Sequence, residues 1–499
     1  AIGYAALYDC TGANNIAIGM EAMKYNTTSS GSAAVGYHAL YNNSTGSQNV
    51  AIGAQSLYNI TSGPDNVAVG YQAGYSITTG TYMTAVGHQS AFYNTSGNIA
   101  AFGYQAGHSN TTGSANTAVG RYRPLFTNTT GNSNTAIGDQ ALLSNTTASY
   151  NTAVGAGALK LNTTGVQNTS LGFESLRENT TGADNTAVGL YAGLSNTTGN
   201  YNIAVGTSAL LSNTTASYNT AVGYQALYSN DSGTRNVAIA PFSVDACTSG
   251  NYNIGIGYAA LSSLTTASYN IAIGDSAGAS VTTGINNTFI GGSAGNQTST
   301  GSYNVGVGIS ALQFATGGNA NYNTAIGTEA LYSSTTTRDN TAVGYQALYA
   351  QTTAAQSIAV GNYALDSVTT GNENTAVGYQ AGNTITTAAA NTLFGRLAGR
   401  DTTGSYNTFL GHNSGYQMTS GSSNTILGRY NGNQGGLDIR TGNNYIVLSD
   451  GDGNLRLIID SVGRFLVGTT VQTTSSTQSG EISSAGAVGF MFSQTSTAA

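Results

Sequence analysis

The stretch Asn219-Thr-Ala-Val-Gly-Tyr-Gln-Ala-Leu-Tyr-Ser-Asn-Asp-Ser-Gly-Thr-Arg235 is one copy of a 17-residue unit that recurs along most of the chain. We number its positions 1 to 17. Positions 2 to 4 are the small and β-branched residues that strands prefer, and the Gly of position 5 indicates a bend. Positions 6 to 10 are consistent with a second short strand, and positions 11 to 17 carry turn residues. The unit therefore predicts a strand, a bend, a short strand and a loop.

The opening pattern Asn-(Thr/Val/Ile)-Ala-(Val/Ile)-Gly recurs at a nearly constant spacing. Clear copies start at 49, 66, 116, 134, 151, 185, 202, 219, 270, 323, 340 and 374, and degenerate copies fill the gaps from 15 to 424. Most spacings are 17 residues, and the exceptions differ by one or two. Pro124 and Pro241 lie in irregular copies, where we expect local bulges, or else a docking point for another protein.

This period selects a parallel β-solenoid among the repeat architectures. Helical repeats run to about 33–47 residues and a propeller blade needs about 40. The Asn-Thr-Thr-Gly clusters would also interrupt a helix in every repeat. One coil of a narrow all-β solenoid fits 17 residues. About 25 such coils, stacked at roughly 4.8 Å each, predict a rod on the order of 120 Å long.

Stacking places equivalent residues of successive coils in columns. Like charges in a column repel, which explains why charged residues make up only 7% of the chain. Asn columns can instead form chains of amide hydrogen bonds. We predict a structural Asn ladder at position 1, formed by Asn49, Asn66, Asn116, Asn134, Asn151, Asn185, Asn202 and Asn219. A second, partial Asn column at position 12 ends at Cys247, which we interpret as a change of surface near residue 236.

Sequence patterns for catalysis, metal binding or cofactor binding are absent, so we expect neither an enzyme nor a cofactor. His38, His88, His108 and His412 fall at different repeat positions without a recurring acidic partner, and Cys10 and Cys247 have no metal spacing. The Asp-Gly-Asp-Gly-Asn run at 450–454 lacks the spaced Glu of a calcium loop and predicts a turn. The net charge of −7 disfavours nucleic acid, and no apolar run is long enough to insert in a membrane.

The repeat period ends near the C-terminus, which defines three expected regions. Residues 1–443 form the solenoid shaft, and 444–470, with three short strand-like runs, form a β-rich cap that aligns the chains. Residues 471–499 are rich in Ser and Thr and are expected to be a linker or the start of a distal region. The Asn-x-Thr sequences at position 12 are either turn residues or, in a secreted eukaryotic protein, glycosylation sites.

The motif Asn-x-Ala-(Val/Ile)-Gly resembles the head repeat of trimeric autotransporter adhesins, which form a trimeric β-roll. The longer unit "NTAVGYQALYSN" more closely resembles repeats in tail-fibre proteins of marine bacteriophages, including cyanophages. Residues 444–470, "NYIVLSDGDGNLRLIIDSVGRFLVGTT", are similar to the segment that commonly follows such repeats in phage fibres. This resemblance implies a homotrimeric virion fibre outside the cell. Its partners would be other tail or virion proteins and, through a distal tip, a host surface receptor that is possibly a glycan.

The residues themselves also favour association of copies, because a 17-residue coil has a thin interior. We expect the Ala and Gly of positions 3 and 5 to form a face for close approach of another chain, with Leu at position 9 and Tyr at positions 6 and 10 adding apolar surface to be covered. The abundant Tyr side chains either cover the solenoid or bind sugars. The leading function is a structural fibre for host attachment. The alternatives are a bacterial trimeric adhesin and an ice-binding solenoid, which would use the Thr residues of position 2.

Overall fold

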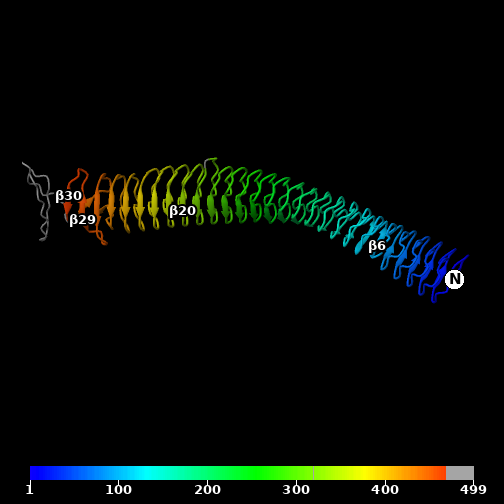
Figure 1. The fold of residues 1–499 in the computed structure, drawn as a ribbon. Helices are drawn as coiled ribbons and strands as arrows, with labels where there is room; N and C mark the ends of the chain where they lie inside the picture. Colours follow the sequence, from blue (N-terminus) through cyan, green and yellow to red (C-terminus); the bar gives the residue numbers. More distant parts are fainter. Residues whose placement is uncertain (319, 468–499) are drawn as a thin grey trace, which may run out of the picture. The chain divides into compact units, whose positions relative to one another are not determined.

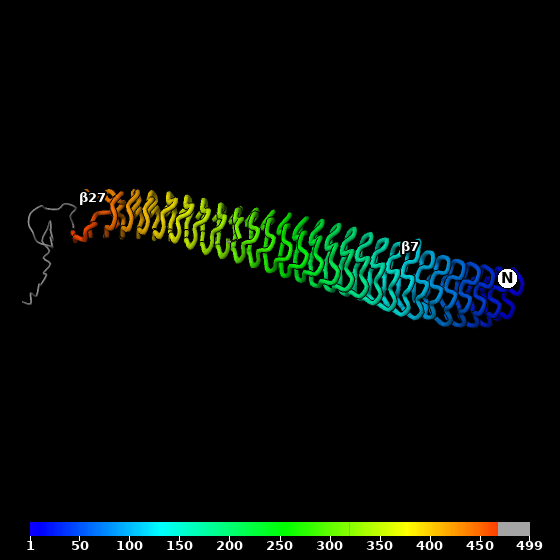
Figure 2. Tube along the Cα trace, turned by 90° about the horizontal axis from the view of Figure 1, so that it is seen from above, coloured from blue at the N-terminus to red at the C-terminus, as the bar shows by residue number. Residues whose placement is uncertain are grey.

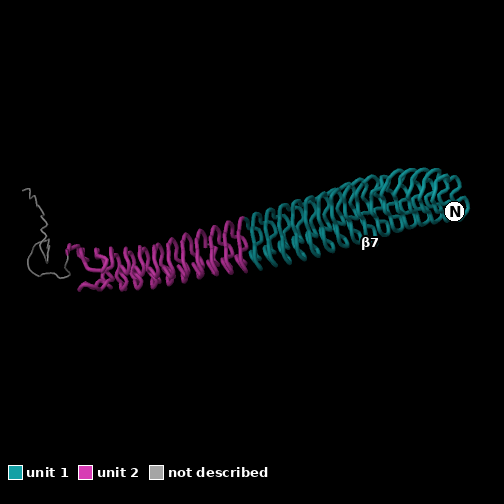
Figure 3. The backbone as a smooth tube through the Cα atoms, turned by 90° about the horizontal axis from the view of Figure 1, so that it is seen from below, with its two compact units in different colours: residues 1–268 teal, residues 269–499 magenta. Residues whose placement is uncertain are grey.

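The computed structural model describes residues 1–318 and 320–467. They belong to two compact units, Ala1–Ser268 and Tyr269–Ala499, which are coloured separately in Figure 3. Each unit is a stack of coils, and Figure 2 shows that every turn of the chain lies against the next within its unit. All regular elements of the described residues are β-strands. The predicted all-β parallel solenoid with a 17-residue repeat is therefore confirmed.

The first unit contains fifteen strands, one per coil, and each pairs in parallel with the strand of the next coil. The pairing joins equivalent repeat positions, so that Thr220, Ala221 and Val222 face Val237, Ala238 and Ile239. The strands are β1 (Ile16–Ile18), β2 (Ala33–Val35), β3 (Val50–Ile52), β4 (Val67–Val69), β5 (Thr84–Val86), β6 (Ile99–Tyr104), β7 (Asn116–Tyr122), β8 (Thr135–Ile137), β9 (Thr152–Val154), β10 (Thr169–Leu171), β11 (Thr186–Val188), β12 (Ile203–Val205), β13 (Thr220–Val222), β14 (Val237–Ile239) and β15 (Ile254–Ile256).

The second unit continues the same design with ten coil strands and then changes character (Figure 1). Its coil strands are β16 (Ile271–Ile273), β17 (Thr288–Ile290), β18 (Val305–Val307), β19 (Thr324–Ile326), β20 (Thr341–Val343), β21 (Ile358–Val360), β22 (Thr375–Val377), β23 (Thr392–Phe394), β24 (Thr408–Leu410) and β25 (Thr425–Leu427). The later strands are β26 (Asn433–Gln434), β27 (Leu437–Asp438), β28 (Ile446–Ser449), β29 (Leu455–Ile459) and β30 (Phe465–Val467).

Six repeat positions of each coil point into its interior. In the coil that starts at Asn219 they are positions 1, 3, 8, 9, 12 and 15, occupied by Asn219, Ala221, Ala226, Leu227, Asn230 and Gly233. The Ala residues of positions 3 and 8 are small enough for the two walls of the coil to lie close together. Leu at position 9 fills most of the remaining space. Where position 9 is Gly, another interior side chain takes the room, as Met83 does beside Gly74 and Ile99 beside Gly107.

Positions 6 to 10 do not form the predicted second strand. In the coil that starts at Asn49, Gln55 and Leu57 have φ angles of 58° and 49°, whereas a strand needs negative φ throughout. Because residues with positive φ alternate with others along this segment, the N–H groups of Gln55 and Leu57 point to the coils on opposite sides. Gln55 donates to the Tyr37 carbonyl of the preceding coil at 2.8 Å, and Leu57 donates to the Ala73 carbonyl of the following coil at 3.0 Å. The segment is therefore a run of turns hydrogen-bonded to the coils on both sides.

The Gly of position 5 forms the bend that ends most coil strands, whereas β6 and β7 continue through Gly103 and Gly120. Gly223, for example, has a φ of 138°, and a Cβ added there would lie 2.6 Å from the carbonyl carbon of Ala240 in the next coil. Both the left-handed backbone and the close approach of the next coil require Gly. Ala240, which precedes Pro241, is an exception with a φ of 103°. The irregular coil before Pro124 carries the expected bulge, a register shift between Phe102 and Tyr104 where β6 pairs with β7.

The C-terminal strands begin by extending the solenoid. β28 pairs in parallel with β25, so the first run of the predicted cap adds one more strand to the stack. β29 and β30 then pair antiparallel, as the three strand-like runs predicted. The loop before β28 holds the small hairpin β26–β27 and the buried Tyr430, whose hydroxyl donates to the Leu437 carbonyl at 2.7 Å. The end of the predicted cap beyond 467 and the expected linker 471–499 lie outside the described residues.

Candidate interaction surface

All eight Asn residues predicted at position 1 are buried in the interior wall. Each side-chain amide donates to the position-15 carbonyl of its own coil at 2.8–3.0 Å and so closes the loop. The side-chain oxygen accepts the backbone N–H of the next coil, as Asn49 does from Asn66 at 2.9 Å and Asn202 from Asn219 at 3.0 Å. Met83 and Ile99 separate Asn66 from Asn116 in this column. Position 1 therefore joins coils mainly through backbone-to-side-chain bonds.

Position 12 holds the chain of amides that stacking favours. Asn110, Asn128, Asn145, Asn162, Asn179, Asn196, Asn213 and Asn230 are linked by consecutive Nδ2-to-Oδ1 hydrogen bonds of 2.6–3.0 Å. The chain stops where Cys247 follows, and the buried Oδ1 of Asn230 has no hydrogen-bond partner. The sequence change near 236 is therefore a change of the interior, and its interpretation as a surface change is wrong. The burial of these amides favours a structural role for the Asn-x-Thr sequences over glycosylation.

Aromatic side chains form a second kind of column at position 10. Tyr41, Tyr58, Tyr75, Phe92, His108 and Phe126 stack with ring centroids 5.0–5.4 Å apart and interplanar angles of at most 20°. Burial and, to a lesser extent, Arg123 lower the pKa of His108, which favours the neutral ring within the stack. Because neighbouring rings cover one another's faces, the column covers the coil and leaves little ring face for a sugar.

A Gln column runs beside these rings. Gln72, Gln89 and Gln105 each donate to the Gln of the preceding coil at 2.8–2.9 Å, and the first acceptor is Gln55. Arg123 completes the column by donating to Gln105 Oε1 at 2.8 Å. Sequence reasoning missed this ladder, although the recurrence of Gln at position 7 was the available signal. The Gln and aromatic columns therefore form ordered, half-buried stacks along part of the first unit, whereas the Asn column of position 12 lies inside it.

The outward face of the sheet is uncharged, and position 4 is apolar in every coil. Position 4 of each coil strand carries Val, Ile, Leu or Phe, and none of these side chains is buried. Among them, Ile52, Leu171 and Phe394 are 43%, 47% and 50% exposed. Position 2, which points the same way, carries only Thr, Val, Ile and Ala in the strands β1 to β25. Parallel sheets are normally covered on both faces, so this face lacks the layer that usually covers it.

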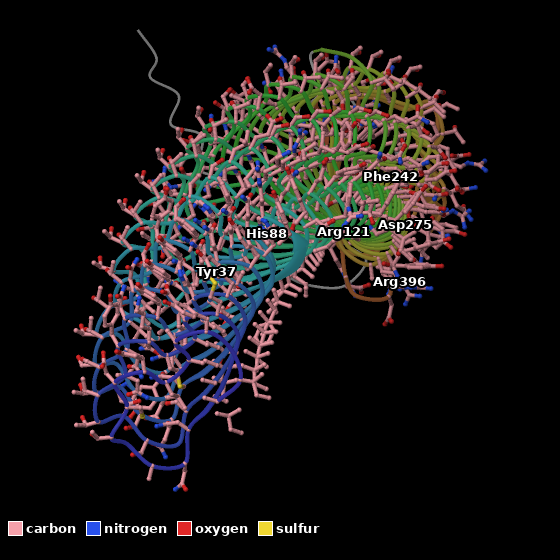
Figure 4. The ribbon with its side chains drawn as sticks, turned by 90° about the vertical axis from the view of Figure 1, so that its right-hand side faces the viewer. Tyr37, His88, Arg121, Phe242, Asp275 and Arg396 are labelled. Carbon is pink, nitrogen blue, oxygen red and sulfur yellow. The ribbon has the colours of Figure 1, made fainter. Side chains whose placement is uncertain are left out.

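The expected Ala and Gly contact face does not exist. Ala221 and Ala238 at position 3 are fully buried inside their own coils, as is Leu227 at position 9. The alternation along a strand turns positions 2 and 4 outward as soon as position 3 turns inward. The surface available to another chain is therefore the apolar strip of positions 2 and 4. Position 6 flanks it with exposed side chains, among them Tyr37, His88, Arg121 and Arg396 in Figure 4.

Titratable groups are dispersed among structural contacts. Glu21 accepts from Lys24 and contacts His38, each at 2.7 Å, and the hydrogen bond from Lys24 is the main cause that lowers the pKa of Glu21. Hydrogen bonds from Asn454 and Arg456 hold the pKa of Asp450 well below its usual range, which makes 450–454 a turn closed by its own side chains. In residues 1–318 and 320–467, no three His, Cys, Asp or Glu side chains are grouped to hold a metal ion.

Comparisons with known proteins returned no match to a family model, a curated protein or a solved structure. The described part of the chain has no helix long and apolar enough to cross a membrane. The fold and the surface define a parallel β-solenoid with an uncovered apolar sheet face.

Proposed function

We propose that this chain is the shaft of an extracellular virion fibre, such as a phage tail fibre, in which three parallel copies pack through the outward faces of their sheets. The apolar strip of positions 2 and 4 is the observation that carries the proposal. Fifteen strands at about 4.8 Å, with about 7 Å between the two positions, make an uncharged strip on the order of 500 Å² in the first unit alone, in which Thr holds position 2 of seven strands. That is close to the largest patch that a typical monomer exposes, about 300–600 Å².

A second copy of the chain is the partner that matches this strip best. Its positions 2 and 4 repeat at the same rise and carry no charge from β1 to β25, so each coil can meet its equivalent without burying an unpaired ion. Coil lengths differ at a few heights, as at the bulge between β6 and β7. Only parallel copies in register place each irregular coil against its own equivalent. Chains joined in this way would form a fibre suited to holding a receptor-binding tip away from the particle.

The assembly is tested by measuring the mass of the purified chain with light scattering and its shape with electron microscopy. We expect a trimer of the 50.4 kDa chain and a rod on the order of 120 Å. Replacing Val154, Val188, Val205 and Val222 of position 4 by Thr keeps β-branched side chains but makes the strip polar, and should release monomers. The control replaces the exposed Thr147, Thr164, Thr181 and Thr198 of position 14 by Val and should remain trimeric. A wild-type chain that is a folded monomer would contradict the proposal.

The virion assignment needs its own experiment. Antibodies against the chain should label appendages of purified particles in immuno-electron microscopy. Labelling of a bacterial surface in place of particles would favour the trimeric adhesin, for which the same shaft is suitable.

One observation favours an ice-binding solenoid as a second candidate. Thr117, Thr135, Thr152, Thr169 and Thr186 of position 2 follow one another without interruption, and all point outward beside aliphatic residues of position 4. This strip would have to be exposed to bind ice, so the two functions exclude each other on the same face. A monomer with thermal hysteresis in solution would support ice binding, and a trimer without it would support the fibre.

A further inference from the structure

Three basic side chains occupy one column in the second unit. Arg396, His412 and Arg429 stand at position 6 of consecutive coils, and all three are exposed. Equivalent residues of neighbouring coils lie about 4.8 Å apart along the stack. Like charges rarely stack in this chain, since their repulsion opposes stacking. The other case in the described residues is Lys160 and Arg177 at position 10 of consecutive coils, where Arg177 lies 3.8 Å from Glu174. Such a departure from the rule that shapes the sequence is typical of a functional site.

These two arginines are not neutralised by carboxylates. Eight of the 13 Lys and Arg side chains form ion pairs in the described residues, but Arg396 and Arg429 are not among them. Arg396 donates through Nη1 to Nε2 of His412 at 3.2 Å and lies 5.7 Å from the centre of the Tyr379 ring.

The nearest acid in the column does not cancel this charge. Asp450 follows Arg429, whose backbone N–H donates to the Asp450 carbonyl oxygen at 3.3 Å. The carboxylate of Asp450 is bound by Arg456 and by Asn454. Arg396, Arg429 and Arg456 against Asp450 and Asp452 leave one net positive charge in this region, on a chain whose total charge is −7.

We propose that Arg396, His412 and Arg429 bind the anionic groups of an acidic saccharide, such as its carboxylates or sulfates. The guanidinium forks donate to the planar or tetrahedral oxyanion, and the open column at the surface accepts a polymer that runs along the stack. The assignment to a saccharide rests on the proposed role in host attachment. Two arginines are too few for a nucleic acid track or for the four to eight basic residues of an anionic-membrane site.

The test measures binding of the full chain to immobilised polygalacturonate, dextran sulfate and neutral dextran. The variant R396Q/R429Q removes the column, whereas the control R338Q/R440Q removes two exposed arginines that are paired with Asp339 and Asp438. Both variants carry the same net charge. We expect the wild type and the control to bind an acidic polymer at least about tenfold tighter than dextran, and R396Q/R429Q to lose most of that preference.

The proposal is overturned if the wild type does not prefer either acidic polymer, or if both variants lose binding equally, which would indicate general charge attraction. Competition by poly-glutamate as effective as that by polygalacturonate would overturn the saccharide assignment and point to an acidic peptide. Comparison of polygalacturonate with dextran sulfate shows whether the site prefers carboxylates or sulfates. The mass of the assembly, measured on the same samples, tests the fibre independently of this site.

Discussion

The ring of Phe289 occupies the space that a side chain on Gly295 would need. A Cβ added to Gly295 would lie 2.4 Å from Cδ1 of that ring. The two residues hold positions 3 and 9 of one coil, where other coils carry Ala and Leu. The interior of each coil therefore conserves its filled volume although the residues that fill it change.

This exchange predicts a compensating pair of mutations. F289A should leave a cavity and cost about 3–5 kcal/mol, and G295L should clash with the ring. The double variant restores the common Ala and Leu, so its stability should return to within about 1.5 kcal/mol of the wild type. Denaturant unfolding combined with hydrogen exchange of this coil measures all four proteins. Additive losses in the double variant would show that the two sites do not share one volume.

The Gly of position 5 should be far less replaceable than that of position 15. Gly206 has a φ of 130°, and an added Cβ would lie 2.5 Å from the Gly223 carbonyl oxygen of the next coil. G206A should therefore cost more than the 1–3 kcal/mol typical of a strained backbone alone. The control is G165A, where an added Cβ would also approach the next coil, 2.2 Å from the Gly182 carbonyl oxygen, but where the backbone is not left-handed. Ala148 and Ala216 already occupy position 15 in their coils, so the two variants separate the cost of the left-handed φ from that of the close approach. Equal melting temperatures of G206A and G165A would contradict the requirement for Gly at the position-5 bend.

A break in the middle of the Asn ladder should cost more than a break at its end. Asn179 donates to Asn162 at 2.8 Å and accepts from Asn196 at 2.7 Å. N179A leaves buried groups unpaired in both directions, and each costs about 1–3 kcal/mol. N230A interrupts only one direction, because Oδ1 of Asn230 is already without a partner. Hydrogen exchange of the flanking coils should show the larger loss of protection for N179A.

Extending the ladder by one residue should stabilise the first unit. In C247N, the new amide can donate to the unpaired Oδ1 of Asn230. The unpaired acceptor moves to the new terminal residue, so the net gain is one hydrogen bond, about 1 kcal/mol. The control, C247S, is too short to reach Asn230 and should not gain. A C247N protein that is less stable than C247S would show that the ladder ends there for another reason.

Thiol labelling should distinguish the two cysteines. Burial raises the pKa of Cys247 to about 11, so at pH 8 this thiol is protonated as well as inaccessible. Cys10 is only half-buried. An aromatic disulfide reagent at pH 8 should modify Cys10 in the native protein and Cys247 only after denaturation. Mass spectrometry of the peptides identifies the site, and rapid native labelling of Cys247 would contradict the packed interior.

The periodic residues were sufficient to predict the solenoid, the strand at positions 2 to 4 and the stacking in register. They did not show which side of that strand faces inward. Val222 and Thr220 look like core residues beside the small Ala221, but the coil is too narrow for them, and the Ala takes the interior. The turns at positions 6 to 10 were also missed, because Gln55 and Leu57 adopt positive φ without the Gly or Asn that usually signals it.

The site residues show the same limit. The Asn columns could be found from their spacing alone, whereas the ends of the ladders depend on particular neighbours, such as Cys247 after Asn230 or Arg123 after Gln105. The uncovered strip could not be located before the inward side of the strand was known. The basic column of Arg396, His412 and Arg429 follows from the sequence only once each residue is assigned to its repeat position.

The closing of most coils by their own Asn, as Asn219 closes on the Gly233 carbonyl, has a consequence for how such a chain changes during evolution. A gene segment that encodes one whole coil can be duplicated or lost by recombination, and the flanking coils then meet in the register they already use. The length of the solenoid can therefore change by one coil at a time while the fold stays the same. Gain or loss of one coil within the ladder from Asn110 to Asn230 should hardly change stability. Gain or loss of a coil at the end of the ladder changes which buried atom lacks a hydrogen-bond partner.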